Sequence, residues 1–227
     1  MPIEYKLIRS NRKTLSIQVD GDCEIIVKAP LRASKAQIDE IVERHRRFIE
    51  NSLERRRTTA QQIAAFRMTY EYRPCFLGQN YDIKVTDEDR IGFDGISFYM
   101  PGDMPGTEIM HVLELIYKSL AKKYMPDRVN HWAKIMNVSP MSVKITSAKT
   151  RWGSCSTKNT VNFSWRLILA SPKAIDSVVV HELAHMTEHN HSEKFWATVN
   201  EYCPDYETAE NELRQLSKKF STEGWDI

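Results

Sequence analysis

The segment that most constrains the fold is residues 171–196, SPKAIDSVVVHELAHMTEHNHSEKFW. Ser171 followed by Pro172 is typical of a helix start, because serine caps the first turn and proline fits the first helical position. The apolar run 178–180 then leads into the HELAH sequence of residues 181–185. We therefore predict a buried helix that carries two histidines near its end.

Histidines four positions apart lie on one face of a helix, since four residues advance about 40° beyond a full turn. His181 and His185 can thus share a metal ion, and Zn²⁺ suits imidazole ligands. Glu182 lies next to them without being a ligand, where it can activate a zinc-bound water. Four of the seven histidines of the chain fall within residues 181–191. This clustering favours a metal site over an accidental match.

His191 is the predicted third ligand, because six residues after His185 a chain that leaves the helix can return an imidazole to the metal. The return needs a sharp break, and the longer pattern HExxHxxGxxH has glycine there, whereas this chain has Glu188. Asn190 is the nearest residue that tolerates a left-handed conformation, and Ser192 can cap the following helix. The weaker ligand candidates are His189, Glu193 and Glu201.

The composition is that of an ordinary globular protein. The 227 residues are 41% hydrophobic and 27% charged, with a net charge of +2, which excludes collagen-like and disordered chains and gives no net-charge argument for nucleic acid. No apolar run approaches the roughly 18 residues of a membrane span, and the N-terminal residues do not resemble a signal peptide. We expect a cytoplasmic protein without a membrane partner and with four reduced cysteines.

The N-terminal part alternates apolar and polar residues. The alternation over residues 5–29 predicts a β-hairpin around Asp20-Gly21-Asp22, followed by one amphipathic helix capped by Ser34. A second β region is expected over residues 74–100. Because prolines and glycines punctuate residues 101–106, we place a domain boundary there, with an N-terminal β-rich region carrying a basic helix (1–104) and a second domain (105–227).

The second domain is predicted to be mainly helical with a small sheet, so that the fold class is α+β. One helix is expected over residues 107–124, interrupted at Met125-Pro126, and another over residues 127–136. Strands are predicted at 141–147 and 161–169. Residues 201–227 are expected to form a solvated helix and tail.

The chain resembles the YgjP-like metallopeptidases and, more distantly, the SprT-like and WLM proteases. The segments that carry the resemblance are 151–156, Asn162, 165–167, 178–185, 190–192 and Phe195-Trp196. The resemblance implies a zincin-like catalytic domain and a zinc-dependent hydrolase that acts on a peptide or protein substrate. It also implies that His181, His185 and His191 bind Zn²⁺ and that Glu182 is catalytic.

Residues near the motif allow more than one interpretation. The strand around residues 161–163 is expected to pair with an extended substrate. Arg151 and Arg166 either bind an anionic group or make structural contacts, and Trp152 and Trp165 are expected in the core. The small residues Cys155 and Cys203 are expected to be buried.

Two alternative functions stay open on the sequence. The first is a metal hydrolase that acts on a non-peptide substrate such as a nucleotide, and the second is a nucleic-acid-associated module with a structural zinc. The arginines at positions 44, 46, 47 and 55–57 suit phosphate binding, but interleaved glutamates are more typical of a solvated helix. The sequence does not define the oligomeric state or the natural substrate.

Overall fold

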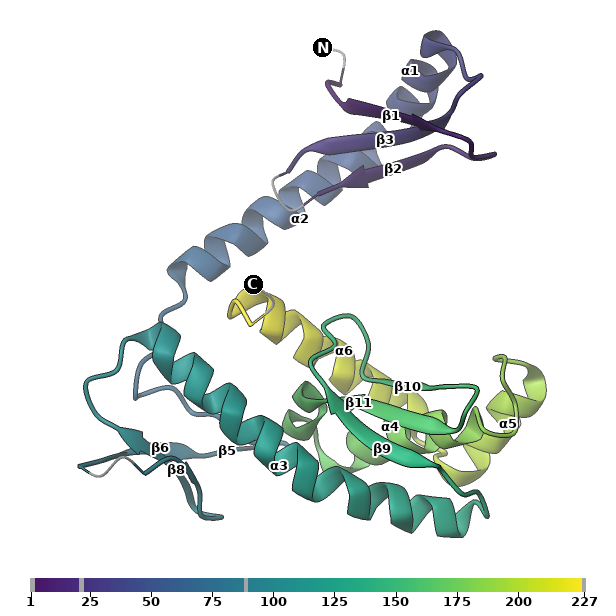
Figure 1. Cartoon of the computed structure of the whole chain (residues 1–227). Coiled ribbons are helices and arrows are strands. Elements are labelled where there is room, and N and C mark those ends of the chain that lie inside the picture. Colours follow the sequence, from purple (N-terminus) through teal and green to yellow (C-terminus); the bar gives the residue numbers. More distant parts are fainter. Residues whose placement is uncertain (1–2, 21–22, 88–89, 226–227) are drawn as a thin grey trace. The chain divides into compact units, whose positions relative to one another are not determined.

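The structure is a computed structural model that describes residues 3–20, 23–87 and 90–225. It has the predicted α+β class and divides into two compact units (Figure 1). Unit 1 is Met1–Phe66 with Ser221–Gly224, and unit 2 is Arg67–Phe220 with Trp225–Ile227. None of the helices in the described ranges is long and apolar enough to cross a bilayer.

Unit 1 is a three-stranded sheet packed against two helices. Its elements are β1 (Lys6–Ser10), β2 (Ser16–Val19), β3 (Ile25–Pro30), α1 (Lys35–Arg44) and α2 (Arg46–Ala65). The strand order is β1-β3-β2, and β2 and β3 form the predicted antiparallel pair, while β1 runs parallel to β3. Residues 21–22 of the predicted turn lie outside the described residues. The buried core of the unit consists of Val27, Ala29, Ile38, Val42 and Ile49.

The helix predicted after Ser34 is two helices in the structure. Ser34 forms the expected cap, because its side chain accepts a hydrogen bond from the Gln37 N–H. His45 separates α1 from α2. On this surface Arg46 pairs with Glu43 at 2.6 Å, as expected for a solvated helix with interleaved charges.

The β region before residue 101 belongs to unit 2. It contains β4 (Cys75–Phe76), β5 (Gln79–Asn80), β6 (Asp82–Thr86), β7 (Gly92–Phe93) and β8 (Ser97–Pro101). The Leu77 N–H donates to the Ile168 carbonyl at 2.9 Å, and the Phe98 ring lies 5.7 Å from that of Tyr117. The observed division at Phe66 therefore differs from the boundary expected at 104/105, because the prolines and glycines mark only a turn within one packed unit.

A single helix, α3 (Gly106–Ile135), replaces the two helices predicted on either side of Pro126. Proline removes one backbone hydrogen bond, but Met125 and Val129 on either side of it are fully buried. Tertiary packing thus maintains the helix through the proline. The helix packs against β9 (Ser142–Thr146) and α4 (Pro172–Ala184), which are labelled in Figure 1. It also packs against the 3₁₀ helix η1 (Trp165–Leu169).

The sheet beside α3 contains β9 (Ser142–Thr146), β10 (Gly153–Cys155) and β11 (Thr160–Ser164), in the order β10-β11-β9. The predicted strand 161–169 therefore ends at Ser164 and continues as η1. The expectation that residues 161–163 offer a free edge is wrong, since β11 is paired with β10 on one side and β9 on the other. The two edge strands of this sheet are β10 and β9, and Gly153 of β10 lies against Glu182.

Three further helices follow: α4 (Pro172–Ala184), α5 (Glu193–Tyr202) and α6 (Tyr206–Thr222), and α6 belongs to unit 2 up to Phe220. The segment after α6 is not the expected solvated tail. Trp225 is only 6% exposed and packs against the rings of Tyr117 and Trp165. Its carbonyl accepts a hydrogen bond from Arg166 at 2.8 Å, so Trp225 is part of the core.

Candidate metal centre

Helix α4 positions the first two histidines. As predicted, Ser171 caps it by accepting a hydrogen bond from the Ala174 N–H, and Pro172 occupies the first turn. His181 and Glu182 lie in its last turn, and His185 is the residue at which it ends. The valines that precede them are buried, so the helix is fixed by packing up to the site.

The chain reverses direction between His185 and Ser192. The N–H groups of Thr187 and Glu188 both donate to the Ala184 carbonyl, and Ser192 forms the predicted cap of α5 by accepting from Phe195. No residue from 185 to 192, all of which the structure describes, has a positive φ. The expected left-handed conformation at Asn190 is therefore wrong, because the helix ends earlier in a tight turn.

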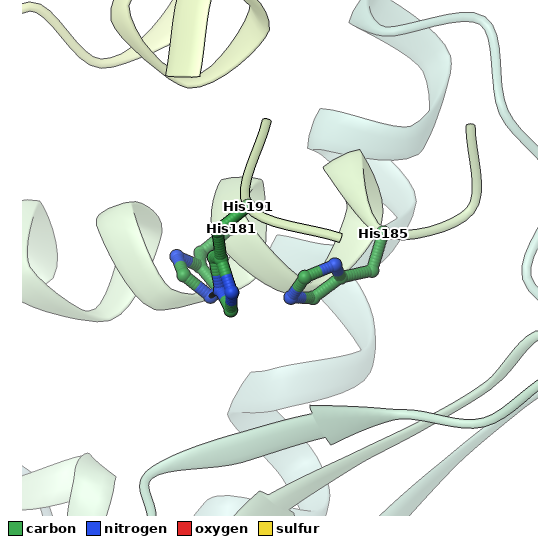
Figure 2. Close-up of side chains that lie close together, drawn as sticks. All are labelled: His181, His185 and His191. Carbon is green, nitrogen blue, oxygen red and sulfur yellow. Dashed lines mark hydrogen bonds between the residues drawn. The ribbon is translucent and has the colours of Figure 1, made fainter. Parts of the chain in front are cut away.

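His181, His185 and His191 come together after this reversal. One ring nitrogen from each lies within 4.8 Å of the other two, and Figure 2 shows the three rings around one point. The Nε2 atoms of His181 and His191 are 3.2 Å apart. Among the described residues the cluster holds no fourth candidate ligand. The other candidates considered, His189, Glu193 and Glu201, are not part of it.

The donor set fits a zinc ion. Two imidazoles bound tetrahedrally at 2.0–2.1 Å have nitrogens about 3.4 Å apart, close to the separation seen between His181 and His191. The Nδ1 atom of His185 is 3.1 Å from the Glu188 carbonyl, and that of His181 is 3.0 Å from the Tyr206 hydroxyl. A proton on each Nδ1 leaves Nε2 free for a metal, as in other histidine sites with an outer hydrogen bond.

Burial favours the neutral form of the His181 and His185 imidazoles. Burial, with smaller contributions from the neighbouring His185 and His191, lowers the pKa of His181 to about 4. Burial also lowers the pKa of His185, against the opposing effect of the Glu188 carbonyl. Neutral imidazole is the form that binds metal.

Each histidine ring also stacks on an aromatic side chain. His185 stacks on Phe195 and His191 on Trp196, both from α5. His181 stacks on Tyr206, the first residue of α6, with an interplanar angle of 17°. The role of Tyr206 was missed at the sequence level, since 25 residues separate it from His181 and no local pattern links them.

Glu182 is enclosed between α4 and β10. It is 6% exposed, and its carboxylate accepts a hydrogen bond from the Cys155 N–H. A Cβ atom at Gly153 would lie 2.7 Å from Glu182 Oε1, so only glycine allows this close approach. Burial raises the pKa of Glu182 to about 7, although Cys155 and the charge of Arg151 oppose the shift. Such a carboxyl group can exchange protons near neutral pH.

A cavity of about 380 Å³ opens beside His181 and Glu182. Besides these two, its lining consists of Arg151, Trp152, Gly153, Val178, Tyr206, Glu210, Leu213 and Arg214. Trp152 was expected in the core but is half-buried and lines this cavity. Arg151 is exposed at its border. We call this cavity the Trp152 pocket.

The other residues that the sequence analysis considered contribute to packing and backbone contacts and not to the histidine cluster. Trp165 is 1% exposed, as expected for the core, and Arg166 is buried. Arg166 donates to the carbonyls of Ser147, Ala148 and Trp225, which supports the structural alternative for this arginine. Cys155 and Cys203 are half-buried rather than fully buried.

Residues 13–216 match the family model described as YgjP-like, metallopeptidase domain. The chain belongs to the YgjP-like family. The match spans both units, so the metallopeptidase assignment concerns nearly the whole of this YgjP-like chain.

Two solved structures are similar to parts of this YgjP-like protein. The metallopeptidase zymogen abylysin of Pyrococcus abyssi is 23% identical, with 41% of this chain and 92% of that chain covered and a TM-score of 0.36. The metallopeptidase zymogen jannalysin of Methanocaldococcus jannaschii is 22% identical, with 42% and 91% covered and a TM-score of 0.33. A comparison with curated proteins gave no match.

Proposed function

We propose that this YgjP-like metallopeptidase is a zinc enzyme of the HExxH type that hydrolyses peptide bonds. In this proposal His181, His185 and His191 hold the metal, and Glu182 is the general base. The observation that carries the proposal is the convergence of three imidazole nitrogens within 4.8 Å of one another, beside a buried carboxylate on the same helix.

Zinc, when bound by three protein ligands, polarises a carbonyl and lowers the pKa of water at its open position. Glu182 can accept a proton from the attacking water at its carboxylate and later donate it to the leaving amine. The Cys155 N–H fixes that carboxylate, and Gly153 lets it approach the strand. Phe195 and Trp196 hold two of the imidazole rings in place by stacking.

The free edge of β10 can bind the substrate backbone. The Ser164 N–H donates to the Trp152 carbonyl, and the Ser156 N–H donates to the Thr160 carbonyl. Trp152, Ser154 and Ser156 thus face β11, and the backbone groups of Gly153 face away from it. An extended peptide can add to this edge as a further strand.

The substitution Glu182→Gln tests the proposal. We expect the variant to bind one zinc ion like the wild type, since the ligands are unchanged, and to hydrolyse an unfolded protein substrate at least about a hundredfold more slowly. Zinc content is measured by elemental analysis and cleavage by mass spectrometry.

Glu193→Gln is the matched control, because Glu193 is an exposed carboxylate on the neighbouring helix. It should retain both zinc and activity, whereas His185→Ala should lose zinc. Full activity of the Glu182→Gln variant would contradict the role of the base, and full zinc content of the His185→Ala variant would contradict the ligand set.

Two alternatives receive less support. The case for a nucleotide substrate depended on Arg151 and Arg166. Of these two, Arg166 donates to backbone carbonyls, and Arg151 alone lines the cavity beside the site. A structural zinc needs a fourth protein ligand, and the described residues supply three. Assays with nucleoside triphosphates and the same variants separate these cases.

We also propose that the protein works in a reducing compartment such as the cytoplasm. All four cysteines are free thiols, whereas disulfides form in oxidising compartments.

A further inference from the structure

The charges of unit 1 are divided unevenly between its sheet and its helices. Residues 8–19 and 25–38, which contain β2, β3 and the turns beside them, include six lysines and arginines and no aspartate or glutamate. The helices carry carboxylates, and four of these pair with a lysine or arginine of the same two helices: Asp39, Glu40, Glu43 and Glu50. The sheet side of unit 1 is therefore positive, although the whole chain is nearly neutral.

Two lysines lie on the face of the sheet that points away from α1 and α2. Leu7, Val27 and Ile17 are paired across the three strands and pack in the core with the helices. Because side chains alternate along a strand, their neighbours point to the opposite face. Lys6 of β1 and Lys28 of β3 are such neighbours, so both project from the outer face.

Arg12 extends this outer face beyond the end of β1. Its Nη1 donates to Ser16 Oγ at 3.0 Å, and Ser16 lies directly opposite Lys28. The guanidinium of Arg12 is thus held beside a lysine, and Lys13, which follows it, is exposed. Like charges that are held together repel each other, so an anion bound at this place gains free energy.

Arg32 lies in the turn that follows β3, at the same end of the sheet. Since β1 and β3 are parallel, this turn and the turn that carries Arg12 both leave the sheet there. The Arg9 guanidinium fixes the turn, because its Nη1 is 2.7–3.2 Å from three carbonyl oxygens, those of Pro30, Leu31 and Ala33. Arg9 therefore positions Arg32 and has a structural role of its own.

We call this surface the basic face and define it by five residues: Lys6, Arg12, Lys13, Lys28 and Arg32. Within the described ranges none of the five forms an ion pair. Lysines and arginines that have no carboxylate partner remain available to phosphate groups, and a cluster of them on one face is the electrostatic signature of nucleic-acid binding.

The composition of the basic face favours a duplex over other polyanions. Residues 6–19 and 25–35 contain no aromatic side chain, whereas proteins that hold single strands usually stack the bases on aromatic rings. Leu31 is the one apolar side chain of these segments that is more than half exposed, at 62%. A lone exposed leucine is ordinary on a protein surface and gives little insertion into a membrane.

We propose that the basic face of unit 1 binds double-stranded DNA through its phosphates, without reading the base sequence. The five cations supply the affinity, and the absence of carboxylates from residues 8–19 and 25–38 keeps the field positive over the whole face. This inference goes beyond the proposed peptidase function and does not depend on it, since every candidate zinc ligand lies in unit 2.

Fluorescence anisotropy of the full-length protein with a labelled DNA duplex of about 20 base pairs tests the proposal. Five phosphate contacts predict a slope of about −4.5 for log K against log salt concentration. Lys6→Gln/Lys13→Gln removes two exposed cations, so it should reduce this slope to about −2.7 and weaken binding at least about tenfold near 0.1 M salt. Arg32→Gln provides a second readout and should reduce the slope by about 0.9.

Arg44→Gln/Arg46→Gln is the matched control. It removes the same charge from unit 1, but these arginines lie on the helix side and pair with Glu40 and Glu43 at 2.9 and 2.6 Å. The control should keep the wild-type slope and affinity, and circular dichroism checks the folding of every variant. The proposal is overturned if the wild type does not bind DNA, if no basic-face variant changes the slope, or if the control loses as much affinity.

Other polyanions serve as competing ligands for the basic face. The probes are a single strand of the same length, an RNA duplex of the same sequence, and vesicles that contain phosphatidylserine. Weaker binding of the single strand than of the DNA duplex supports the proposal, because the basic face offers no stacking platform. Tighter binding of the single strand or of the RNA duplex, or sedimentation with the vesicles without DNA binding, would overturn the assignment to double-stranded DNA.

Discussion

At the scale of single residues, the site depends on groups that hold the ligands rather than on the ligands alone. Tyr206 contacts His181 twice, through a hydroxyl 3.0 Å from Nδ1 and through ring stacking. Burial, with smaller contributions from the carboxylates of Glu210 and Glu182, raises the pKa of Tyr206 to about 12. The hydroxyl therefore stays protonated and neutral in the physiological range. The hydroxyl oxygen can accept a hydrogen bond from the Nδ1–H of His181 and so fix the orientation of the ring.

Tyr206→Phe should weaken zinc binding about tenfold, because the phenyl ring keeps the stacking but leaves Nδ1 without its partner. Competition with a chromophoric chelator measures the affinity. Tyr202→Phe, which removes a hydroxyl near the end of α5 and outside the histidine cluster, should leave it unchanged. An unaltered affinity in Tyr206→Phe would show that the hydrogen bond does not support the ligand.

Much of the site could be predicted at the residue scale, because it rests on local spacing. HELAH gives two imidazoles on one helical face, and Ser192 marks the start of the next helix. Tyr206 and Gly153 could not be predicted, since their roles arise from contacts between distant segments. The prediction of a left-handed backbone conformation at Asn190 was wrong, because a helix can also end in a tight turn in which every φ is negative.

At the scale of elements, the position of α4 against α3 determines where the ligands lie. Arg128 on α3 donates from Nε and Nη2 to the two carboxylate oxygens of Asp176 on α4, at 2.8 and 2.7 Å. The side chains are 27% and 19% exposed. Paired donation of this kind, partly shielded from water, fixes both distance and orientation.

Asp176→Asn should lower the free energy of unfolding by about 1–3 kcal/mol, since the partly buried guanidinium of Arg128 loses its anionic partner. Urea unfolding followed by tryptophan fluorescence reports this, because all five tryptophans lie within unit 2. Glu114→Gln, which breaks the pair with Lys118 within α3, should cost less than about 0.5 kcal/mol. Equal losses for the two variants would argue against a special role for the α3–α4 pair.

The elements that could be predicted are those whose own residues define them. The hairpin of β2 and β3 follows from alternation, and the starts of α1 and α4 follow from Ser34 and Ser171. Pro126 misled the prediction because tertiary packing outweighs a local helix-breaking residue. The prediction placed the free edge of the sheet at residues 161–163, which form the central strand. Strand order depends on contacts between distant segments, so the local sequence could not reveal it.

At the scale of the whole molecule, the chain has two compact units, and every candidate ligand lies in unit 2. The boundary between the two units could not be predicted from prolines and glycines alone. It depends on the contacts of β4 with η1 and of β8 with α3, which join the second β region to unit 2. Zinc that binds only the folded form stabilises it by about 2.7 kcal/mol at a hundredfold excess over Kd. This stabilisation belongs to the unit that holds the ligands.

Chelation should therefore act on one unit. We expect removal of zinc to raise amide hydrogen exchange in α4 and in the turn between His185 and Ser192, with exchange in β1, β2 and β3 unchanged. Exchange measured by mass spectrometry on zinc-loaded and chelated protein gives the comparison. A uniform increase over both units, or none in α4, would contradict this expectation.

X-ray absorption at the zinc edge tests the central claim most directly. The three-histidine site predicts one zinc ion per chain, with three imidazole nitrogens at about 2.0–2.1 Å and a light-atom ligand completing the coordination shell. His191→Ala should remove one imidazole from this shell. A sulfur ligand at about 2.3 Å, a shell that is the same in the His191→Ala variant, or a purified protein that takes up no zinc would contradict the account.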